Sequence, residues 1–346
     1  MRVKDVLTYP YVIARTRAII GNLLRIDDYH ALLGCSKPVH VIDILTQTGY
    51  REHLKLGTPP LDSSSIRQII LNSFVSNFEQ TISSIPKDAA PLLLAYRELL
   101  ESWSLVNALR TLLFQSSFIA ESQIIPCGII ERSFYETLSS DLTKTVSLIS
   151  RREPFQEAAP HTKSAIETNR LGPLFGILKS PLDKCSEAIS FLPFIEREVS
   201  RKLLYLHGDL GNILILYDCV RRQVQPEDAK SWLLEKTYFL QKDVLDQSIL
   251  SHNTGELTRF LESTEFGRYL SNIPSNGPTG EFLEKLRFDV LRDKSRLALA
   301  GYPFRVATIM AALNLKLIET ANIMLCLKAI ERKIPAENAL NCIVVP

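Results

Sequence analysis

The sequence has little glycine and no closely spaced cysteines. Fourteen glycines in 346 residues amount to about 4%, against ~7% in an average protein. Chains with few glycines and many Leu, Ile, Ala, Glu, Lys and Arg residues favour helices over tightly turned sheets. The closest pair of cysteines, Cys326 and Cys342, is 16 positions apart, so neither a CxxC redox pair nor a zinc half-site is present. Scattered thiols of this kind indicate a reducing compartment.

A long hydrophobic run, an excess of one charge and paired histidines are also lacking. One of the longest charge-free apolar stretches, Val306–Leu315, is well short of the ~18 residues that a membrane span needs. Lysine and arginine number 40 against 38 acidic residues, so no broad basic field for nucleic acid is expected. The six histidines show no i, i+3 or i, i+4 pairing. We therefore expect no membrane span, no nucleic-acid partner, no metal and no cofactor.

Helical patterns in the sequence are long and strong, whereas strand patterns are weak. From Leu99 to Leu113 apolar residues step by four, three, three and four positions, which is one face of an α-helix. This helix is expected to begin near Pro91, since proline is favoured in a first turn. A second helix is predicted from just after Pro303 to about Lys333, with apolar residues on several faces, and it should be buried along much of its length. The chain is predicted to be all-α.

Aromatic residues recur at a long and regular interval. Three windows place an aromatic residue six positions after an apolar one, and these aromatics are Tyr50, Phe155 and Phe266. Their spacings are 105 and 111 residues. Self-similarity at a nearly fixed interval is the sequence signature of repeated structural units.

A second and unrelated marker reports nearly the same interval. Asn107, Asn212 and Asn322 are spaced by 105 and 110 residues. We interpret the chain as three tandem helical units, residues 1–115, 116–225 and 226–346, whose boundaries fall in polar, proline-containing stretches. Coincidence among common residue types is the alternative to this interpretation.

The recurring asparagines are expected to serve helix packing. Asparagine is a poor helix former because its amide competes for backbone groups. Inside an apolar helix it is expected to bond a neighbouring loop or helix in each unit, and the alternative is an exposed surface amide. Asp209 and Glu319 stand three residues before the second and third asparagines, and we group them with the asparagines as helix-packing residues.

Six segments of the chain, taken in order, form a recognisable pattern. They are Tyr9–Ala18, Leu45–Tyr50, Ile125–Ile129, Tyr302–Phe304, Ile318–Ile323 and Lys333–Glu337. The last three are a Tyr-Pro-Phe segment before a predicted helix, a Glu-x-x-Asn pattern within that helix and a short basic segment after it. In this order and spacing the segments resemble the C/d family of rotary ATPases, which comprises the archaeal-type C subunits and the vacuolar d subunits, over about residues 1–340.

The sequence departs from the family pattern in two places. The first unit has Ser104 where an acidic residue is usual. The second unit lacks a threonine at the position equivalent to Thr48 and Thr264. These departures concern local detail more than the family resemblance itself.

The resemblance implies both a fold and a role. The family fold is three similar helical domains around a pseudo-threefold axis, in the shape of a funnel. The implied role is a non-catalytic rotor adaptor without a cofactor, which receives the central-stalk subunits and sits on the membrane proteolipid ring. Torque through it would couple ATP synthesis or hydrolysis to the transport of protons or sodium. The implied location is peripheral, on the cytoplasmic face of the cell membrane, as part of the ATPase complex.

Two basic residues near the start of the chain, Arg15 and Arg17, are candidates for binding a partner protein. The alternative is a solvated helix face on which the arginine stems lie against apolar neighbours. We carry both residues forward as candidates for a partner interface.

One stretch of the sequence favours an enzyme instead. Residues 206–215 resemble the catalytic loop of small-molecule phosphotransferases, in which His-Gly-Asp is followed by four residues and then by Asn-Ile-Leu. The aspartate of such loops handles the substrate hydroxyl and the asparagine binds magnesium, so their separation is a geometric requirement. Here two residues separate Asp209 from Asn212, which shortens the span by about 6–7 Å at ~3.3 Å per residue. A small-molecule phosphotransferase that uses this HGDLGN segment is therefore the alternative function, and helix packing is the favoured interpretation.

Overall fold

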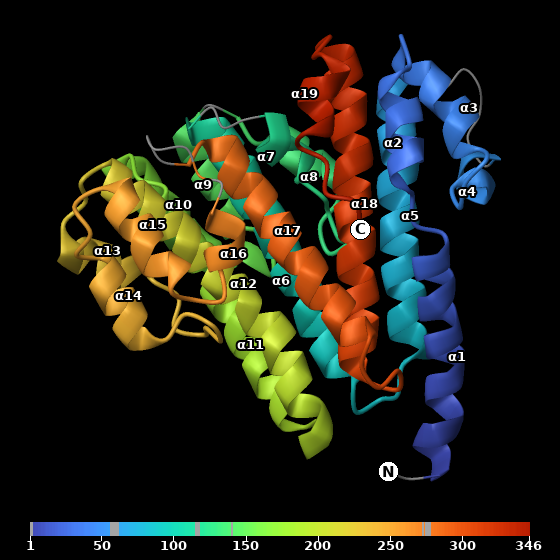
Figure 1. Cartoon of the computed structure of the whole chain (residues 1–346), viewed down its shortest axis with the longest axis horizontal. Coiled ribbons are helices and arrows are strands. Elements are labelled where there is room, and N and C mark those ends of the chain that lie inside the picture. Colours follow the sequence, from blue (N-terminus) through green and yellow to red (C-terminus); the bar gives the residue numbers. More distant parts are fainter. Residues whose placement is uncertain (1–2, 56–61, 115–117, 140, 272, 274–277) are drawn as a thin grey trace.

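A computed structural model describes residues 3–55, 62–114, 118–139, 141–271, 273 and 278–346 of the protein. Within these ranges the regular elements are α-helices and short 3-10 helices, and there is no strand (Figure 1). The prediction of an all-α chain is therefore confirmed. The expected unit boundary between residues 115 and 116 lies outside the described residues.

The helices follow one another along the whole chain. The first group is α1 (Val3–Gly21), α2 (Ile26–Leu33), η1 (Pro38–His40), α3 (Val41–Leu45), α4 (Arg51–Lys55), α5 (Ser63–Ser84) and α6 (Ala90–Phe114). The second group is α7 (Phe118–Ser122), α8 (Arg132–Thr137), α9 (Leu142–Ser150), η2 (Phe155–Glu157), α10 (Ala158–Thr168), η3 (Gly172–Leu178), α11 (Lys179–Ser190) and α12 (Phe194–Arg221). The last group is α13 (Pro226–Trp232), α14 (Lys242–Ser248), α15 (Thr254–Glu262), α16 (Gly267–Leu270), α17 (Gly280–Leu299), α18 (Val306–Glu331) and α19 (Ala336–Leu340).

Three long helices, α6, α12 and α18, form the buried centre of the fold. The most apolar is α18, in which every side chain from Val306 to Leu327 is buried. Among the described residues α18 is the one helix that is long and apolar enough to cross a membrane, and its apolar window is wholly buried within the fold. A helix that is apolar on all faces must be covered on all faces, and here neighbouring helices provide the cover.

Three outer helices, α5, α11 and α17, cover the long ones in a closed cycle. Helix α5 packs on α18 and α6, α11 packs on α6 and α12, and α17 packs on α12 and α18. Figure 1 shows α1, α2 and α5 side by side with α18 along one side of the molecule. The first helices of the chain are therefore in direct contact with its last long helix.

Helices α12 and α18 end in the same way. Gln223 and Lys333, each eleven residues after the asparagine of its own helix, have positive φ angles of 50° and 53°. In both helices the next N–H bonds a carbonyl oxygen five residues back, at 2.9 Å. A left-handed residue followed by such a bond is a common way to end a helix, and Pro226 and Pro335 prevent its continuation.

The three long helices begin at one end of the molecule, which we call the base. Residues that precede α6, begin α12 and precede α18 line a single cleft there. The carboxylate of Glu196, in the first turn of α12, accepts the N–H of Val306 at the start of α18 at 3.1 Å. In Figure 1 the base is the lower end, and the three helices run from it towards the opposite end.

Candidate functional site

The three recurring asparagines lie on the three long helices, one on each. All three side chains are buried. The Nδ2 group of Asn212 donates to the carbonyl oxygen of Leu234 at 2.9 Å, and its Oδ1 accepts the N–H of the same residue at 2.8 Å. One amide thus satisfies both backbone groups of a buried residue in the segment that follows α12.

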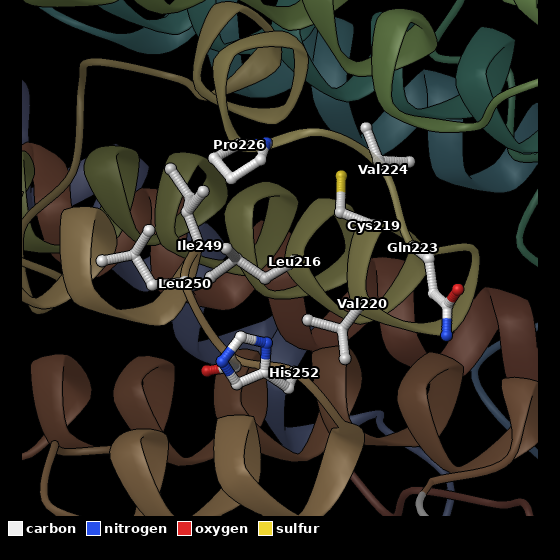
Figure 2. Close-up of a pocket in the computed structure, with 10 residues that line it drawn as sticks. Leu216, Cys219, Val220, Gln223, Val224, Pro226, Ile249, Leu250 and His252 are labelled. Atoms are coloured by element: carbon white, nitrogen blue, oxygen red, sulfur yellow. The ribbon is translucent and has the colours of Figure 1, made fainter.

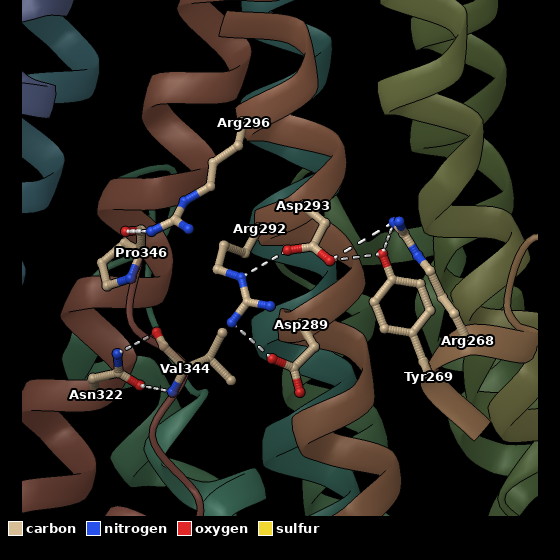
Figure 3. A network of polar contacts seen from close by, with 9 residues as sticks. All are labelled: Arg268, Tyr269, Asp289, Arg292, Asp293, Arg296, Asn322, Val344 and Pro346. Atoms are coloured by element: carbon tan, nitrogen blue, oxygen red, sulfur yellow. Dashed lines mark hydrogen bonds and ion pairs between the residues drawn. The ribbon is translucent and has the colours of Figure 1, made fainter. Parts of the chain in front are cut away.

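Asn322 makes the same two hydrogen bonds with the backbone of Val344. Val344 follows Asn322 by 22 residues, and Leu234 follows Asn212 by the same number. The two distances are 2.8 Å to the carbonyl oxygen and 3.3 Å from the N–H (Figure 3). Asn107 donates to the carbonyl oxygen of Gln123 at 3.2 Å. Buried backbone groups need a hydrogen-bond partner, so in each case the amide replaces a missing secondary-structure contact.

The carboxylate of Asp209 bonds three consecutive backbone N–H groups. They belong to Tyr238, Phe239 and Leu240, and the shortest distances are 3.2, 3.0 and 2.9 Å. Burial raises the pKa of Asp209 to about 6, although these N–H groups act in the opposite direction. The aspartate therefore holds the segment between α13 and α14 against α12.

Glu319 on α18 holds the N-terminal part of the chain rather than the C-terminal segment. Its Oε1 accepts the N–H of Leu24 at 3.1 Å, and its Oε2 accepts a hydrogen bond from Lys316 at 2.7 Å. Both charged side chains are buried, and the Lys316 ammonium lies 4.1 Å from the ring centroid of Tyr50. The buried carboxylate is thus paired with a cation and a backbone donor, as burial of a charge requires.

We call a carboxylate that binds backbone N–H groups in this way an acidic anchor. On α6 the acidic anchor lies one helical turn earlier than the family pattern suggests. Ser104 stands at the expected position and forms two hydrogen bonds with the backbone of Ile125, at 2.6 and 3.1 Å. Glu101, three residues before it, accepts the N–H groups of Cys127 at 2.6 Å and Ile129 at 3.3 Å. Burial raises the pKa of Glu101. Sequence reasoning missed Glu101, although a carboxylate at i−3 from Ser104 lies on the same helix face.

The backbone donors that these three carboxylates bond occupy equivalent positions. Leu24, Ile129 and Leu240 each lie 26 residues before one of the recurring aromatic residues. Those three aromatic side chains are themselves buried. The backbone groups bound by the acidic side chains and the recurring aromatics therefore recur at the same separation in three parts of the chain.

The HGDLGN segment lies in the middle of α12, not in a loop. A Cβ on Gly208 would lie 2.0 Å from the carbonyl oxygen of Lys236, and a Cβ on Gly211 would lie 2.7 Å from a Leu234 side-chain carbon. The two glycines thus let the following segment approach the helix closely. The neighbouring His207 is buried, and burial together with the charge of Arg287 lowers its pKa to about 3, so its imidazole is neutral.

This geometry does not support the phosphotransferase alternative. The carboxylate of Asp209 and the amide of Asn212 are buried and bonded to backbone groups, so neither faces a substrate or a magnesium ion. In the described ranges no group of three or more His, Cys, Asp or Glu side chains is arranged to hold a metal ion.

A family model described as ATP synthase (C/AC39) subunit matches residues 12–341, nearly the whole chain. The chain belongs to this family. The resemblance to the C/d family of V- and A-type rotary ATPases is thereby confirmed. A search of curated proteins found no match.

Membership in the ATP synthase (C/AC39) family fixes the general role. Its members are non-catalytic, rotor-associated subunits of V/A-type ATPases, so the chain is part of a rotary ATPase complex. Its association with the membrane is peripheral, through that complex. The buried anchors described above are structural features of this family member and hold its loops to its long helices.

The two candidate partner residues lie on α1, apart from these anchors. Arg15 is half-buried and Arg17 is exposed on the same helix. Exposure leaves Arg17 accessible to another protein, whereas Arg15 is partly covered. A contact with a partner remains a prediction for both.

A hollow of about 650 Å³ lies beside the C-terminal part of α12 (Figure 2). Mostly apolar side chains line it, among them Leu216, Val220 and the exposed Leu250. Burial raises the pKa of Cys219 in its wall to about 12, which keeps the thiol protonated. A protonated thiol is a poor nucleophile, so this hollow does not suggest a catalytic cysteine.

Proposed function

We propose that the chain is the central-rotor adaptor of an archaeal- or vacuolar-type ion-translocating ATPase, with no active site of its own. It links the central-stalk subunits to the membrane proteolipid ring. The torque that passes through it couples ATP synthesis or hydrolysis to the transport of protons or sodium. Its place is the cytoplasmic face of the cell membrane.

The observation that carries this proposal is the closed cycle of helix contacts. Glu319 on the last long helix holds Leu24 near the start of the chain, and α5 packs on α18. The first and last parts of the chain are therefore packed against each other. A closed assembly of close-packed helices transmits force with little deformation, because protein interiors have low compressibility.

The same contacts support three similar helical units around a pseudo-threefold axis, forming a funnel. The proposed units are residues 1–115, 116–225 and 226–346. Each contributes one long helix with a buried asparagine, and each outer helix bridges two long helices. Each unit leaves an apolar face that only its neighbours cover, as in repeat proteins.

We further propose that the end opposite the base receives the central stalk. There Glu121 of α7 forms ion pairs with Lys328 of α18 and with Arg332 just after it, and Arg67 of α5 pairs with Glu331. A polar, charged surface suits an interface that must assemble and separate, whereas permanent interfaces are more apolar.

Affinity capture tests the proposed partners. The tagged full-length chain, recovered from detergent-solubilised membranes of cells that make the ATPase, is expected to retain central-stalk subunits and ring proteolipid. Recovery of the folded chain without either partner would contradict the proposal.

Calorimetry with magnesium ATP tests the absence of an active site. The purified chain is expected to give no binding heat. A micromolar dissociation constant that Asp209→Ala abolishes would instead show a nucleotide site on α12.

A further inference from the structure

The centre of the fold holds a group of buried polar side chains from three helices. Trp103 of α6, His207 of α12 and Arg287 of α17 are each at most 2% exposed. The Arg287 guanidinium lies 4.0 Å from the ring centroid of Trp103, and the ring centroids of Trp103 and His207 are 6.3 Å apart. We call these three side chains the core cluster. Each comes from a different one of the three proposed units, so the core cluster lies where those units meet.

Every member of the core cluster has a polar group without a hydrogen-bond partner among the described residues. These groups are Nε of Arg287, Nε1 of Trp103 and both ring nitrogens of His207. The arginine and tryptophan nitrogens can only donate, and a neutral imidazole also carries one N–H. Buried polar groups in native proteins are nearly always bonded, so several free donors in one place point to a bound ion or water.

The charges around the core cluster do not balance. Glu284 is buried, forms an ion pair with Arg110 and also attracts Arg287. Burial lowers the pKa of Arg287 to about 10, so its guanidinium is still charged at neutral pH. Two buried cations thus meet one buried carboxylate. An uncompensated charge in a protein interior is costly, which favours a further negative charge at this point.

The other contacts of Arg287 supply no negative charge. Its Nη1 group donates to the side-chain oxygen of Gln123 at 3.0 Å. The guanidinium also lies over the rings of Trp103 and Phe288, and such cation–π contacts attract a cation without neutralising it. The excess positive charge of the core cluster therefore remains.

A cavity of about 270 Å³ at the C-terminal ends of α6 and α12 gives a small solute a route towards the core cluster. Its wall includes Arg110 and Glu284, the two charged neighbours of Arg287. Asp218 in the same wall is already paired with Arg222. Near-complete burial of the core cluster excludes a large ligand, whereas a single small ion needs little space.

We propose that the core cluster binds one small monovalent anion, such as chloride. The free N–H groups of Arg287, Trp103 and His207 donate to the anion, and its charge offsets the excess positive charge. The anion joins helices from all three proposed units and so stabilises their closed packing. An internal water is the competing occupant, since it also satisfies buried polar groups, but it leaves the charge unbalanced.

Thermal melting of the full-length chain in different salts tests the proposal. The wild type should melt about 2–4 °C higher in about 0.3 M chloride than in gluconate of equal ionic strength, because a ligand that binds only the folded state stabilises it. Arg287→Met, which removes the excess charge, should lose this difference. Trp103→Phe keeps an aromatic ring and removes one N–H, so it should need several-fold more chloride for the same rise.

The matched control is Arg292→Met, which removes the same charge from the same helix. Arg292 is only half-buried and pairs with Asp289 and Asp293, so this variant should respond to chloride as the wild type does. Equal melting of the wild type in both salts would overturn the proposal. A chloride response that Arg287→Met and Trp103→Phe both retain would overturn it too, and Trp103→Phe alone decides if Arg287→Met does not fold.

Crystals of the chain grown in bromide would show the bound ion directly. Anomalous scattering should place one bromide within hydrogen-bond distance of Arg287 Nε and Trp103 Nε1. A water molecule at that point without a bromide signal would contradict the proposal. Bromide at surface positions alone would mark an adventitious ion only, with the same consequence.

Discussion

At the scale of single residues, buried amides and carboxylates on the long helices hold loop backbone that has no regular partner of its own. The clearest example is the pair of hydrogen bonds between Asn322 and Val344, next to which Arg296 donates to a backbone oxygen of Pro346 at 2.5 Å (Figure 3). These contacts hold the last residues of the chain against α17 and α18. Their energies can be tested one side chain at a time.

Asn322→Ala is expected to lower the free energy of unfolding by about 1–3 kcal/mol, because it leaves a buried N–H and a buried carbonyl of Val344 without partners. Chemical denaturation measures the change. The matched control is Asn338→Ala, at an exposed position of α19, which should change stability by less than about 0.5 kcal/mol. Equal midpoints for Asn322→Ala and the wild type would show that the amide contributes nothing to stability.

Asp209 is expected to give the stability a distinct pH dependence. Its pKa of about 6 in the folded protein exceeds the ordinary value of 3.8, so between about pH 4 and 6 the folded state binds more protons than the unfolded state. The free energy of unfolding should therefore fall as pH rises through this window, by about 3 kcal/mol in all.

Denaturation of the wild type and of Asp209→Asn at several pH values isolates this effect. The variant has no titrating group at this position, so the difference in stability, wild type minus variant, should decrease from pH 4 to pH 7. An increase over the same range would mean that the three backbone N–H groups outweigh burial.

Much of this residue-scale arrangement could be predicted, but not all of it. The recurrence of asparagine at a fixed spacing pointed to the residues that the structure finds buried, because a polar residue in an apolar helix needs a partner. Glu101 was missed because the repeat pointed to Ser104, and a one-turn shift of a carboxylate leaves no mark in the spacing. The partner of Glu319, Leu24, is 295 residues away, and no local pattern in the sequence indicates it.

At the scale of elements, the fold depends on close approach between long helices and the segments that follow them. Gly208 is the critical position, because the carbonyl oxygen of Lys236 occupies the space that a Cβ would need. The long helices α6 and α18 were predicted from their apolar residues and flanking prolines. The short helices were not, since helices of four to nine residues depend on tertiary contacts rather than on propensity.

Gly208→Ala is expected to lower the free energy of unfolding by about 1–3 kcal/mol, since the added methyl group must displace backbone rather than a flexible side chain. In an unconstrained helix the same change stabilises by up to about 1 kcal/mol. Gly280→Ala, at the first position of α17 with open space around it, is the control and should be neutral or slightly stabilising. A Gly208→Ala protein that melts at or above the wild-type temperature would show that this close approach is not required.

At the scale of the whole molecule, the account requires internal symmetry. Residues 1–115, 116–225 and 226–346 should superpose on one another in an experimental structure, with the three long-helix asparagines at matching positions. Cryo-electron microscopy of the assembled ATPase would provide the coordinates. A helical fold in which these asparagines fall at unrelated positions would contradict the three-unit interpretation, while leaving the family assignment intact.

The most direct test of the central claim is the number of ions moved for each ATP hydrolysed. ATPase complexes reconstituted in vesicles without this chain should still hydrolyse ATP, because the catalytic sites lie on other subunits. They should transport almost no ions, and addition of the wild-type chain should restore transport. Ion transport per ATP that is unchanged in the absence of the chain would contradict the claim that torque passes through it.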